Sequence, residues 1–408
     1  MTVEGLTTVV LGGGVGGLTA ANELRRLLGS EHRVVLVDRH ADQLFAPSLL
    51  WLMVGGRRPA QLSRPLRDLV RRGVEVLRAD VRTIDAERRA IVTADGELSY
   101  DELVVALGAE LAPELMPGYT EAAHNFFEVD GAARFAEALG AFSGGRVVVA
   151  VTALPYKCPA APYEAALLVE AELRRRGLRE RSEVVVVTPE SQPMPVAGPV
   201  LGAAVRALLE ARGIVLRAER PIASIDAAAR ELVLADGTRE RFDLLAATPP
   251  HRAPAAVRGS ALAGPAGWIP VDPRTLRAQN GDAYAIGDIA AITLPGGKPL
   301  PKAGVFAHAE GLVVARNIAA RRTGGASPTF DGHGYCWVEL GQGRAAFVSG
   351  DFYAEPAPRI ALHAPGAVWH IGKVLFERAW MGQGAERWLA RVALRLGARA
   401  MGLGPVSL

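Results

Sequence analysis

The stretch TTVVLGGGVGG, residues 7–17, decides the fold class of this chain. A short apolar run is followed by Gly12, Gly14 and Gly17, and then by residues of helical character from about 18 to 28. A second apolar run, RVVLVD, ends at Asp38. The order strand, glycine turn, helix, strand is typical of the first unit of a dinucleotide-binding α/β fold.

Each of these residues has a physical role in such a unit. Gly12 allows the tight turn, Gly14 lets the backbone approach a pyrophosphate, and Gly17 lets the helix pack closely on the strand. The helix N-terminus presents free N–H groups to the phosphates. Asp38 follows at the distance along the chain from which an acidic side chain accepts hydrogen bonds from ribose hydroxyls.

Two later stretches indicate which dinucleotide is bound. LVVALGA, residues 103–109, predicts a strand ending in a small-residue turn with Ala106 and Gly108. DAYAIGD, residues 282–288, predicts a strand that delivers Gly287 and Asp288. Both resemble the later segments of flavoproteins with two dinucleotide-binding domains. In those proteins an aspartate at the position of Asp288 hydrogen-bonds the ribityl chain of FAD, so the resemblance implies FAD.

The same resemblance implies an α/β fold class with two Rossmann-like domains, the first of which is split around the second. We expect residues 1–112 and 258–325 to form the FAD-binding domain. Residues 113–257 are expected to form the second Rossmann-like domain, and residues 326–408 a C-terminal segment with amphipathic helices.

The second domain contains a strand-helix-strand repeat whose first turn has no glycine. RVVVAV, APYEAALLVEAELRRR and EVVVVT predict a βαβ unit with parallel strands. Relatives that use NADH have a second glycine loop in this turn, whereas here residues 151–164 read VTALPYKCPAAPYE. Its prolines remove N–H donors, and Leu154 and Tyr156 are bulky. NADH is therefore not expected to bind in the usual mode, and another electron donor is required.

This turn also carries the most specific resemblance. PYKCPAAPYE, with Cys158 and Glu164, resembles the sulfide:quinone oxidoreductases and the flavoprotein subunit of flavocytochrome c sulfide dehydrogenase. Cys336, in HGYCWVE, matches their second cysteine. LPKAGVFAHAEGLVVARNI, residues 300–318, resembles their Pro-Lys loop and the helix after it. LFAPSLLWLMVG, residues 44–55 with Pro47, resembles their segment beside the flavin and acceptor site.

The resemblance implies that Cys158 and Cys336 form a redox pair beside FAD. In the family's reaction, sulfide attacks one sulfur to form a persulfide, and two electrons pass through FAD to a quinone. The helix that begins near Pro162, together with Lys157, is expected to stabilise a thiolate at Cys158.

Two further residues have expected roles. Glu164 falls in the first turn of the helix after Cys158 and is the candidate general base. Lys302 precedes a helix, from about 305 to 319, whose N-terminus can stabilise the anion of reduced FAD. The family often has a third cysteine, but this chain has two. FAD is therefore expected to be noncovalent, and the substrate is sulfide, glutathione persulfide or another small thiol.

Composition limits the other classes of protein. The net charge is +3 over 408 residues, and no stretch reads as a nucleic-acid module or as a set of metal ligands. Four lysines stand among 46 basic residues, and the other 42 are arginines. The N-terminus shows no signal-peptide pattern, and the longest uncharged apolar run, residues 44–56, is too short to span a bilayer. A peripheral (monotopic) location on the cytoplasmic side of the cell membrane is expected.

Two amphipathic helices are predicted near the C-terminus, at residues 367–381 and 385–401. In the first, an apolar stripe is expected at Val368, Ile371, Leu375 and Ala379, with Trp369 and Trp380 near its ends. In the second, a basic face at Arg387, Arg391, Arg395 and Arg399 is expected opposite Trp388, Leu389, Val392, Leu396 and Met401. Such a helix suits an anionic membrane surface, where lipid quinone could reach the flavin. A second subunit of a homo-oligomer is the alternative partner.

Three other functions stay open at this point. A flavocytochrome-type sulfide dehydrogenase would pass electrons to a haem partner. A type II NADH:quinone dehydrogenase would show reduction of its flavin by NADH alone. A non-catalytic flavin-binding sensor or interaction protein would show no flavin reduction by sulfide.

Overall fold

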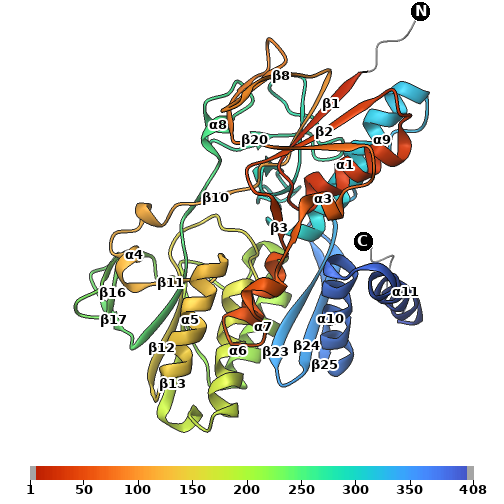
Figure 1. Ribbon diagram of the computed structural model, residues 1–408. Helices are drawn as coiled ribbons and strands as arrows, with labels where there is room; N and C mark the ends of the chain where they lie inside the picture. The colour runs from red at the N-terminus through yellow and green to blue at the C-terminus, as the bar shows by residue number, and fades with distance from the viewer. Residues whose placement is uncertain (1–5, 402–408) are drawn as a thin grey trace, which may run out of the picture.

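The computed structural model describes residues 6–401. Its ribbon shows two stacked α/β units, with a third sheet and a pair of helices from the C-terminal part beside them (Figure 1). This is the predicted α/β class with C-terminal helices.

The first unit is built on a parallel sheet with the strand order β21-β9-β1-β2-β5. Its strands are β1 (Thr7–Leu11), β2 (Arg33–Asp38), β5 (Val74–Arg78), β9 (Glu102–Val105) and β21 (Tyr284–Ala285). Residues 9–11 and 34–37 are almost completely buried, as expected for a parallel sheet covered on both faces. The pairing of β21 with β9 returns the chain to the N-terminal sheet after about 180 residues, Tyr284 lying opposite Val104.

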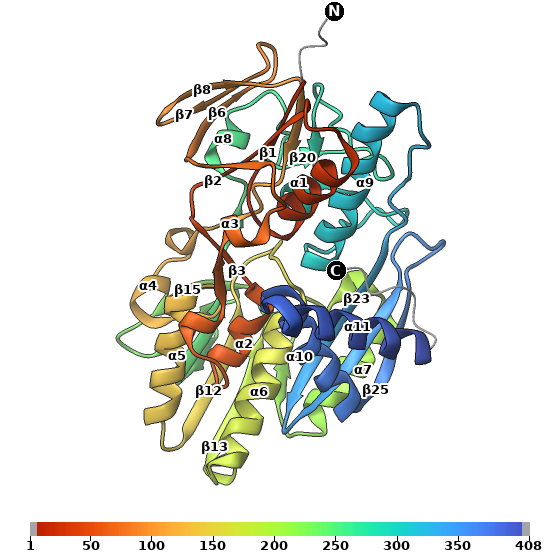
Figure 2. The ribbon, with the colours of Figure 1, turned by 45° about the vertical axis from the view of Figure 1, so that its right-hand side comes forward.

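Helices α1 (Val15–Leu27) and α9 (Gly304–Thr323) pack side by side against this sheet (Figure 2). Their crossing depends on glycine, because a Cβ at Gly311 would lie 2.6 Å from the carbonyl oxygen of Gly16. A small antiparallel sheet, β6 (Val81–Asp85), β7 (Ala90–Thr93) and β8 (Gly96–Ser99), caps the unit. Short elements complete it: β3 (Asp42–Leu44), α2 (Leu49–Leu52), β4 (Ser63–Pro65), α3 (Leu66–Leu69), α8 (Ala255–Arg258), β20 (Ile269–Pro270) and β22 (Ala290–Ala291).

The second unit has a parallel sheet with the order β11-β18-β12-β13-β14. These strands are β11 (His124–Asn125), β12 (Gly145–Val151), β13 (Ser182–Val187), β14 (Val215–Arg217) and β18 (Leu244–Thr248). Its helices are α4 (Tyr119–Ala122), α5 (Val129–Ala141), α6 (Ala161–Arg175) and α7 (Pro199–Glu210). An antiparallel sheet of β15 (Ile222–Asp226), β16 (Glu231–Leu234) and β17 (Arg239–Arg241) adjoins them. Two antiparallel strands, β10 (Glu110–Leu111) and β19 (His251–Arg252), join the units.

Helix α6 lies at the centre of the molecule. Its residues 161–171 are all buried, because the helix contacts β12 and β13 on one side and β23 and α2 on the other. A helix that is apolar almost all round is expected in such a place. The N-terminus of α6, which follows Cys158, therefore lies where both α/β units and the C-terminal sheet meet.

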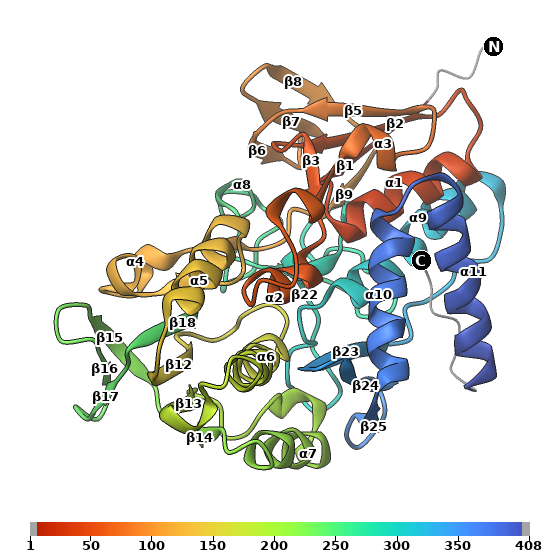
Figure 3. The ribbon, with the colours of Figure 1, turned by 60° about the horizontal axis from the view of Figure 1, so that its bottom comes forward.

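The C-terminal part is an antiparallel sheet followed by a helical hairpin (Figure 3). The strands are β23 (His333–Gly341), β24 (Arg344–Asp351) and β25 (Arg359–Gly366), and the helices are α10 (Ala367–Met381) and α11 (Gly384–Ala400). Both predicted helices exist within one residue of their expected ends. Among residues 6–401, no helix combines the length and the apolar character that crossing a bilayer requires.

The apolar stripe predicted on α10 is partly exposed. Val368 and Ile371 are 50% and 56% exposed, whereas Trp369 and Trp380 are buried. Trp369 and Trp380 lie on the buried side of the helix, where the indole N–H of each has a hydrogen-bond acceptor. Trp369 donates to the Ala364 carbonyl at 3.1 Å, and Trp380 donates to the Gln43 side chain at 2.8 Å.

The predicted arrangement of α11 also needs correction. Ala390, Leu394 and Ala398 form its buried face, while Trp388, Leu389 and Leu396 are 62%, 58% and 60% exposed. Arg387 and Arg391 are half-buried between these two faces. The arginine row thus runs beside the exposed apolar side chains and not opposite them, because the small alanines take the inner face against α10.

Candidate active site

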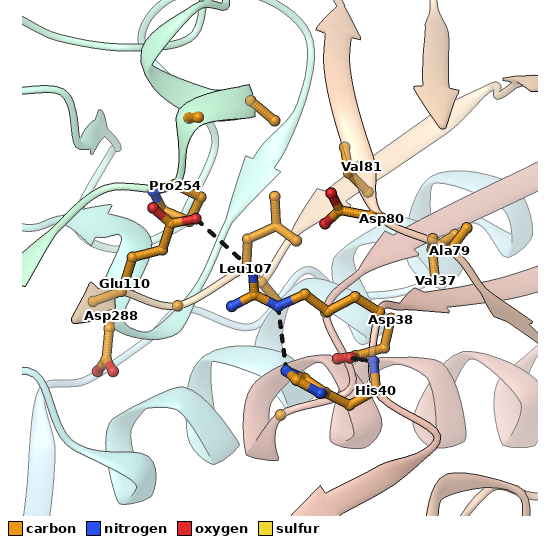
Figure 4. Close-up of a pocket in the computed structure, with 18 of the residues that line it drawn as sticks. Val37, Asp38, His40, Ala79, Asp80, Val81, Leu107, Glu110, Pro254 and Asp288 are labelled. Atoms are coloured by element: carbon orange, nitrogen blue, oxygen red, sulfur yellow. Dashed lines mark hydrogen bonds and ion pairs between the residues drawn. The ribbon is translucent and has the colours of Figure 1, made fainter. Parts of the chain in front are cut away.

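A cavity of about 340 Å³ opens at the carboxyl ends of the first parallel sheet (Figure 4). In open α/β sheets this is where ligands bind. Asp38 and Asp288 lie on opposite sides of the view in Figure 4. Six of the predicted cofactor-binding residues line the cavity: Gly12, Gly14, Asp38, Ala106, Gly108 and Asp288.

The glycine loop fits a dinucleotide. Gly12 has φ +101°, and a Cβ there would lie 2.3 Å from the Ala106 carbonyl oxygen. A Cβ on Gly17 would lie 1.9 Å from the Gly12 carbonyl oxygen, so only glycine lets the helix approach the turn. A Cβ on Gly14 would meet no protein atom within 4 Å. Gly14 therefore keeps space open on the cavity side, as close approach of a pyrophosphate requires.

Asp38 is held in the cavity wall by backbone donors. Its Oδ2 accepts the Gly13 N–H at 2.6 Å, and its Oδ1 accepts the His40 N–H at 2.7 Å. A carboxylate has about four acceptor positions, so two remain for ribose hydroxyls. The free acceptor positions of Asp38 fit the ribose of the adenosine part of FAD, and the glycine loop fits the pyrophosphate.

The other predicted cofactor residues lie outside this cavity. Gly17 is buried in α1. Gly287 and Lys302 line a neighbouring small cavity of about 10 Å³, together with Glu310. Pro47 is exposed in a short 3-10 turn, Ala46–Ser48, next to α2.

Lys302 connects the cavity to the cysteine turn. Its ammonium donates to the Asp288 carbonyl and lies 3.9 Å from the centre of the Trp268 ring. Burial lowers the pKa of Lys302, against the opposing effect of Asp288 and Glu310. Its backbone carbonyl accepts the Cys158 N–H at 2.7 Å. Cys158, Lys302 and Asp288 thus form one continuous hydrogen-bonded path to the dinucleotide cavity.

The turn that carries Cys158 is strained and closely packed. Cys158 has φ +55°, which is rare for a residue with a side chain. Its carbonyl accepts the Ala161 N–H at 2.8 Å, at the start of α6. Strain of this kind persists only where the surroundings fix the backbone, and it is frequent at functional sites.

The second dinucleotide site is filled by the protein's own side chains. Glu190, which follows β13, is buried and accepts hydrogen bonds from Tyr156 at 3.0 Å, Tyr163 at 2.5 Å and Thr188 at 3.2 Å. An acid after the second strand of a Rossmann unit is the usual ribose acceptor. Tyr156 lies in the turn that replaces the glycine loop. Its side chain stands where a pyrophosphate would approach the backbone, and its hydroxyl uses the Glu190 carboxylate that a ribose would otherwise bind.

The structure brings the two cysteines together. Cys158 precedes α6 and Cys336 lies in β23, which packs on α6; both thiols are free. Burial raises the pKa of Cys158 to about 12, and the Glu164 carboxylate adds to this effect. Burial also raises the pKa of Cys336, and the next largest cause is the Cys158 thiol.

The expected thiolate at Cys158 is therefore not favoured by its surroundings. Lys157 lines the dinucleotide cavity, and the cation that lowers the pKa of both cysteines is Lys373 of α10. The predicted effect of the helix is present, since an N–H at Ala161 lowers the pKa of Cys158, but burial is larger. Thiol burial could not be read from the sequence, and it decides that the pKa of Cys158 is raised and not lowered.

Glu164 and Lys373 form a buried ion pair beside the cysteines. The Lys373 ammonium donates to Glu164 Oε1, and both residues are buried. Burial raises the pKa of Glu164 to about 7, although Lys373 opposes it. Burial alone would lower the pKa of Lys373, but the Glu164 and Glu339 carboxylates reverse this and raise it.

Glu339 extends this pair into a chain of polar groups. It is buried in β23, and His370 of α10 lies 2.9 Å from it through Nδ1. The Lys373 ammonium and the His370 ring also face Trp51, at 4.9 Å and 6.1 Å from its ring centre. Glu164, Lys373, Glu339 and His370 thus form a row of titratable groups that runs from the cysteines along α10.

Sequence reasoning missed Lys373, Glu339 and Glu190. Lys373 gave one signal, since it is one of four lysines and lies four residues after the buried Trp369 on the same helix. Glu339 follows Cys336 at odd spacing in a strand, and nothing in its neighbours distinguishes it from a surface acid. Glu190 gave a positional signal, as the acid after the second strand of the inserted unit.

The fold and the cavity define a dinucleotide-binding oxidoreductase with a cysteine pair next to its cofactor site. The family model described as "Pyridine nucleotide-disulphide oxidoreductase" matches residues 6–311. The chain belongs to this family, and it is an oxidoreductase by that membership.

Similarity to particular proteins narrows the class. The mitochondrial sulfide:quinone oxidoreductase of Mus musculus is 26% identical over 369 residues, covering 85% of this chain and 78% of that protein. Its counterpart in Dictyostelium discoideum is 23% identical over 407 residues, covering 95% and 87%. The structure of the sulfide:quinone oxidoreductase from Aquifex aeolicus has the same fold, with a TM-score of 0.84 at 21% identity, covering 98% of this chain and 96% of that chain. The resemblance predicted from PYKCPAAPYE is confirmed.

Proposed function

We propose that this protein is an FAD-dependent enzyme that oxidises sulfide, or a related small thiol or persulfide, through Cys158 and Cys336 and passes the electrons to a membrane quinone. The observation that carries the proposal is the position of the cysteine pair. Cys158 is joined to the dinucleotide cavity through Lys302 and Asp288, and Cys336 lies next to it. The similarity to sulfide:quinone oxidoreductases over most of the chain supports the same substrate class.

In the proposed reaction the oxidised enzyme has a Cys158–Cys336 disulfide. Hydrosulfide attacks one sulfur, the S–S bond breaks, and one cysteine becomes a persulfide while the other leaves as a thiolate. The sulfide sulfur is oxidised by two electrons, and the disulfide is reduced by the same two. The pair would lose two electrons and one proton as it closes again with the added sulfur bridging the two cysteines. FAD, when bound, would supply the acceptor for these two electrons and the donor for quinone.

The chain's own residues supply the proton transfer and the charge balance. Glu164, with its pKa raised to about 7, can take the proton of hydrogen sulfide near neutral pH. Lys373 supplies a positive charge that stabilises a thiolate in a buried place. Lys302 and the N-terminus of α9 are proposed to stabilise charge on the reduced cofactor.

The cofactor-binding residues are proposed as predicted. Gly12, Gly14, Gly17, Asp38, Ala106, Gly108, Gly287, Asp288, Lys302 and Pro47 would hold noncovalent FAD. Residues 1–112 and 258–325 are proposed as the FAD domain, residues 113–257 as the second Rossmann-like domain and residues 326–408 as the C-terminal segment.

Docking on the cytoplasmic side of the membrane is part of the proposal. Val368, Ile371, Trp388, Leu389 and Leu396 form what we call the apolar face of the α10–α11 hairpin, and their exposure supports a lipid contact. The alternative occupant is a second subunit. The side of the membrane is tested by protease accessibility in right-side-out and inverted vesicles.

Anaerobic sulfide titration of the purified holoenzyme tests the reaction. Sulfide should bleach the flavin absorption band, a short-chain quinone should restore it, and NADH should do neither. Bleaching by NADH alone would identify an NADH dehydrogenase instead. Absence of bleaching by sulfide would leave a flavin-binding protein without this activity.

A further inference from the structure

Five arginines gather where α11 meets the first α/β unit, and we call them the arginine cluster. They are Arg64, Arg71, Arg387, Arg391 and Arg395. Arg64 lies in β4, and its Nη1 donates to the carbonyls of Met381 and Gly382 at 2.9 and 2.8 Å, in the turn that leads into α11. Arg387, Arg391 and Arg395 follow at intervals of four residues, which places them along one side of the helix.

The cluster has donors without acceptors. The Nε atoms of Arg64, Arg387 and Arg391 are buried and have no hydrogen-bond partner. No ion pair among residues 6–401 includes any of the five guanidinium groups. Buried cationic donors are normally paired, because desolvation without a partner is costly.

Carboxylates on α1, α10 and α11 are engaged by other partners. Glu23 binds Arg26 at 2.7 Å and Arg316 at 3.0 Å. Glu377 accepts hydrogen bonds from Ser48 at 2.5 Å and from Arg57 at 2.6 Å. Glu386 is exposed and lies 3.9 Å from Arg378. No carboxylate of the described residues therefore balances the cluster.

The titration behaviour agrees with this geometry. Burial lowers the pKa of Arg387, and the positive charge of Arg64 adds to the effect. Burial lowers the pKa of Arg391 to about 10, with further contributions from Arg387, Arg395 and Arg71. Like charges held together in this way create a strong local positive potential.

The apolar face lies beside the cluster on the same helix. Trp388, Leu389 and Leu396 are exposed next to the arginine row, and Val368 and Ile371 are exposed on α10, which packs against α11. A helix with apolar side chains in the acyl region holds neighbouring arginines at the depth of lipid phosphates. Guanidinium groups bind phosphate oxygens in a bidentate way. A soluble anion would not need the apolar surface.

We propose that the arginine cluster binds the phosphate of an anionic phospholipid, so that the enzyme has a defined headgroup site in addition to its apolar contact. This inference rests on the proposed membrane docking and adds a ligand class to it. The site combines Arg64 and Arg71 of the first α/β unit with three arginines of α11. A bound lipid therefore joins the hairpin to the FAD side of the molecule.

Vesicle co-sedimentation of the full-length holoenzyme tests the site. Two vesicle types are compared: phosphatidylcholine alone and phosphatidylcholine with phosphatidylglycerol. The variant Arg391→Gln removes a cluster member, and Arg399→Gln removes the same charge from the same helix outside the cluster. We expect Arg391→Gln to weaken binding to the anionic vesicles about fivefold more than Arg399→Gln does, with no change on phosphatidylcholine. Since Arg391 is buried among like charges, the variant should melt at the same temperature as the wild type or higher.

Three outcomes would overturn the lipid assignment. One is an equal loss for both variants, which indicates nonspecific charge. Another is protection of Arg391 from phenylglyoxal by inorganic phosphate as well as by anionic vesicles, which indicates a free anion. The third is a change of oligomeric state in Arg391→Gln without a change in vesicle binding, which indicates a subunit contact.

Trp388→Ala could lose binding to phosphatidylcholine vesicles while the wild type binds both vesicle types equally. That result would support membrane docking and reject the headgroup site. Sulfide oxidation with a water-soluble short-chain quinone is measured in parallel. Failure of that reaction concerns the proposed enzyme activity and not the lipid site.

Discussion

Lys373 of α10 and Glu164 of α6 form a buried ion pair next to both cysteines, although 209 residues separate them in the sequence. The pair ties the C-terminal hairpin to the helix that follows the Cys158 turn. It also places one proton acceptor and one positive charge where a thiol would be deprotonated. Its removal should therefore affect the chemistry and the position of α10 together.

Replacing the lysine tests its role in charge balance. In Lys373→Met the Glu164 carboxylate loses the cation that opposes burial, so its pKa should rise and a thiolate nearby should become less favourable. We expect anaerobic flavin reduction by sulfide to slow by about tenfold or more, since one pKa unit corresponds to a factor of ten. Stopped-flow absorbance measures this rate. Lys298→Met, which changes an exposed lysine bonded to the Pro195 carbonyl, is the control and should react like the wild type.

The pH dependence follows from Glu164. Its folded-state pKa of about 7 lies above the ordinary value, so the active, ionised base should form as pH rises through about 7. Flavin reduction should increase over this range in the wild type, and Glu164→Gln should lower the rate about a hundredfold and remove this limb. Ionisation of sulfide is common to both proteins, so the difference between their profiles isolates the residue. Glu172→Gln, on the surface side of the same helix, should keep the limb.

The same shift has a consequence for stability. A carboxyl group whose pKa is raised on folding binds more protons in the folded state than in the unfolded state between the two pKa values. Glu164 should therefore lower the free energy of unfolding as pH rises from about 4.5 to about 7. Urea unfolding of the wild type and Glu164→Gln at these two pH values checks the sign. A contribution that grows with pH would contradict the burial of this group.

Local sequence patterns predicted what depends on neighbours along the chain. The glycine loop, β1, β2 and the limits of α10 follow from residues within one strand or one helical turn of each other. Burial at the junction of α6, β23 and α10 depends on packing between segments far apart, and it reversed the expected thiolate at Cys158. The burial of Trp380 depends on such packing too, because its indole N–H donates to Gln43, far away in the sequence.

Glu190 and its tyrosine partners fill the second dinucleotide site, so loss of Glu190 should lower the stability of the fold. Glu190→Ala would leave the Tyr156 and Tyr163 hydroxyls without their acceptor, which should lower the free energy of unfolding by about 2 kcal/mol or more. Urea denaturation measures this loss. Glu180→Ala, at an exposed position, should change stability by less than about 0.5 kcal/mol. Equal stability of the two variants would show that Glu190 does not anchor the turn.

The glycine loop predicts a separation between folding and cofactor binding. Gly14→Ala meets no protein atom, so the apoprotein should melt normally while FAD binding weakens. Gly17→Ala would push against the Gly12 carbonyl at 1.9 Å and should destabilise the apoprotein itself. Melting of the apoproteins and FAD titration by fluorescence distinguish the two. Normal FAD affinity in Gly14→Ala would contradict the proposed pyrophosphate position.

The most direct measurement of the central claim is mass spectrometry of the two cysteine peptides before and after one equivalent of sulfide under anaerobic conditions. Oxidised holoenzyme should yield the Cys158 peptide joined to the Cys336 peptide. Sulfide should first convert this species to a persulfide and a free thiol, and as the flavin band falls the two peptides should be joined again with one added sulfur. If both cysteines alkylate freely in the oxidised enzyme while sulfide still bleaches the flavin, the reaction does not pass through this pair.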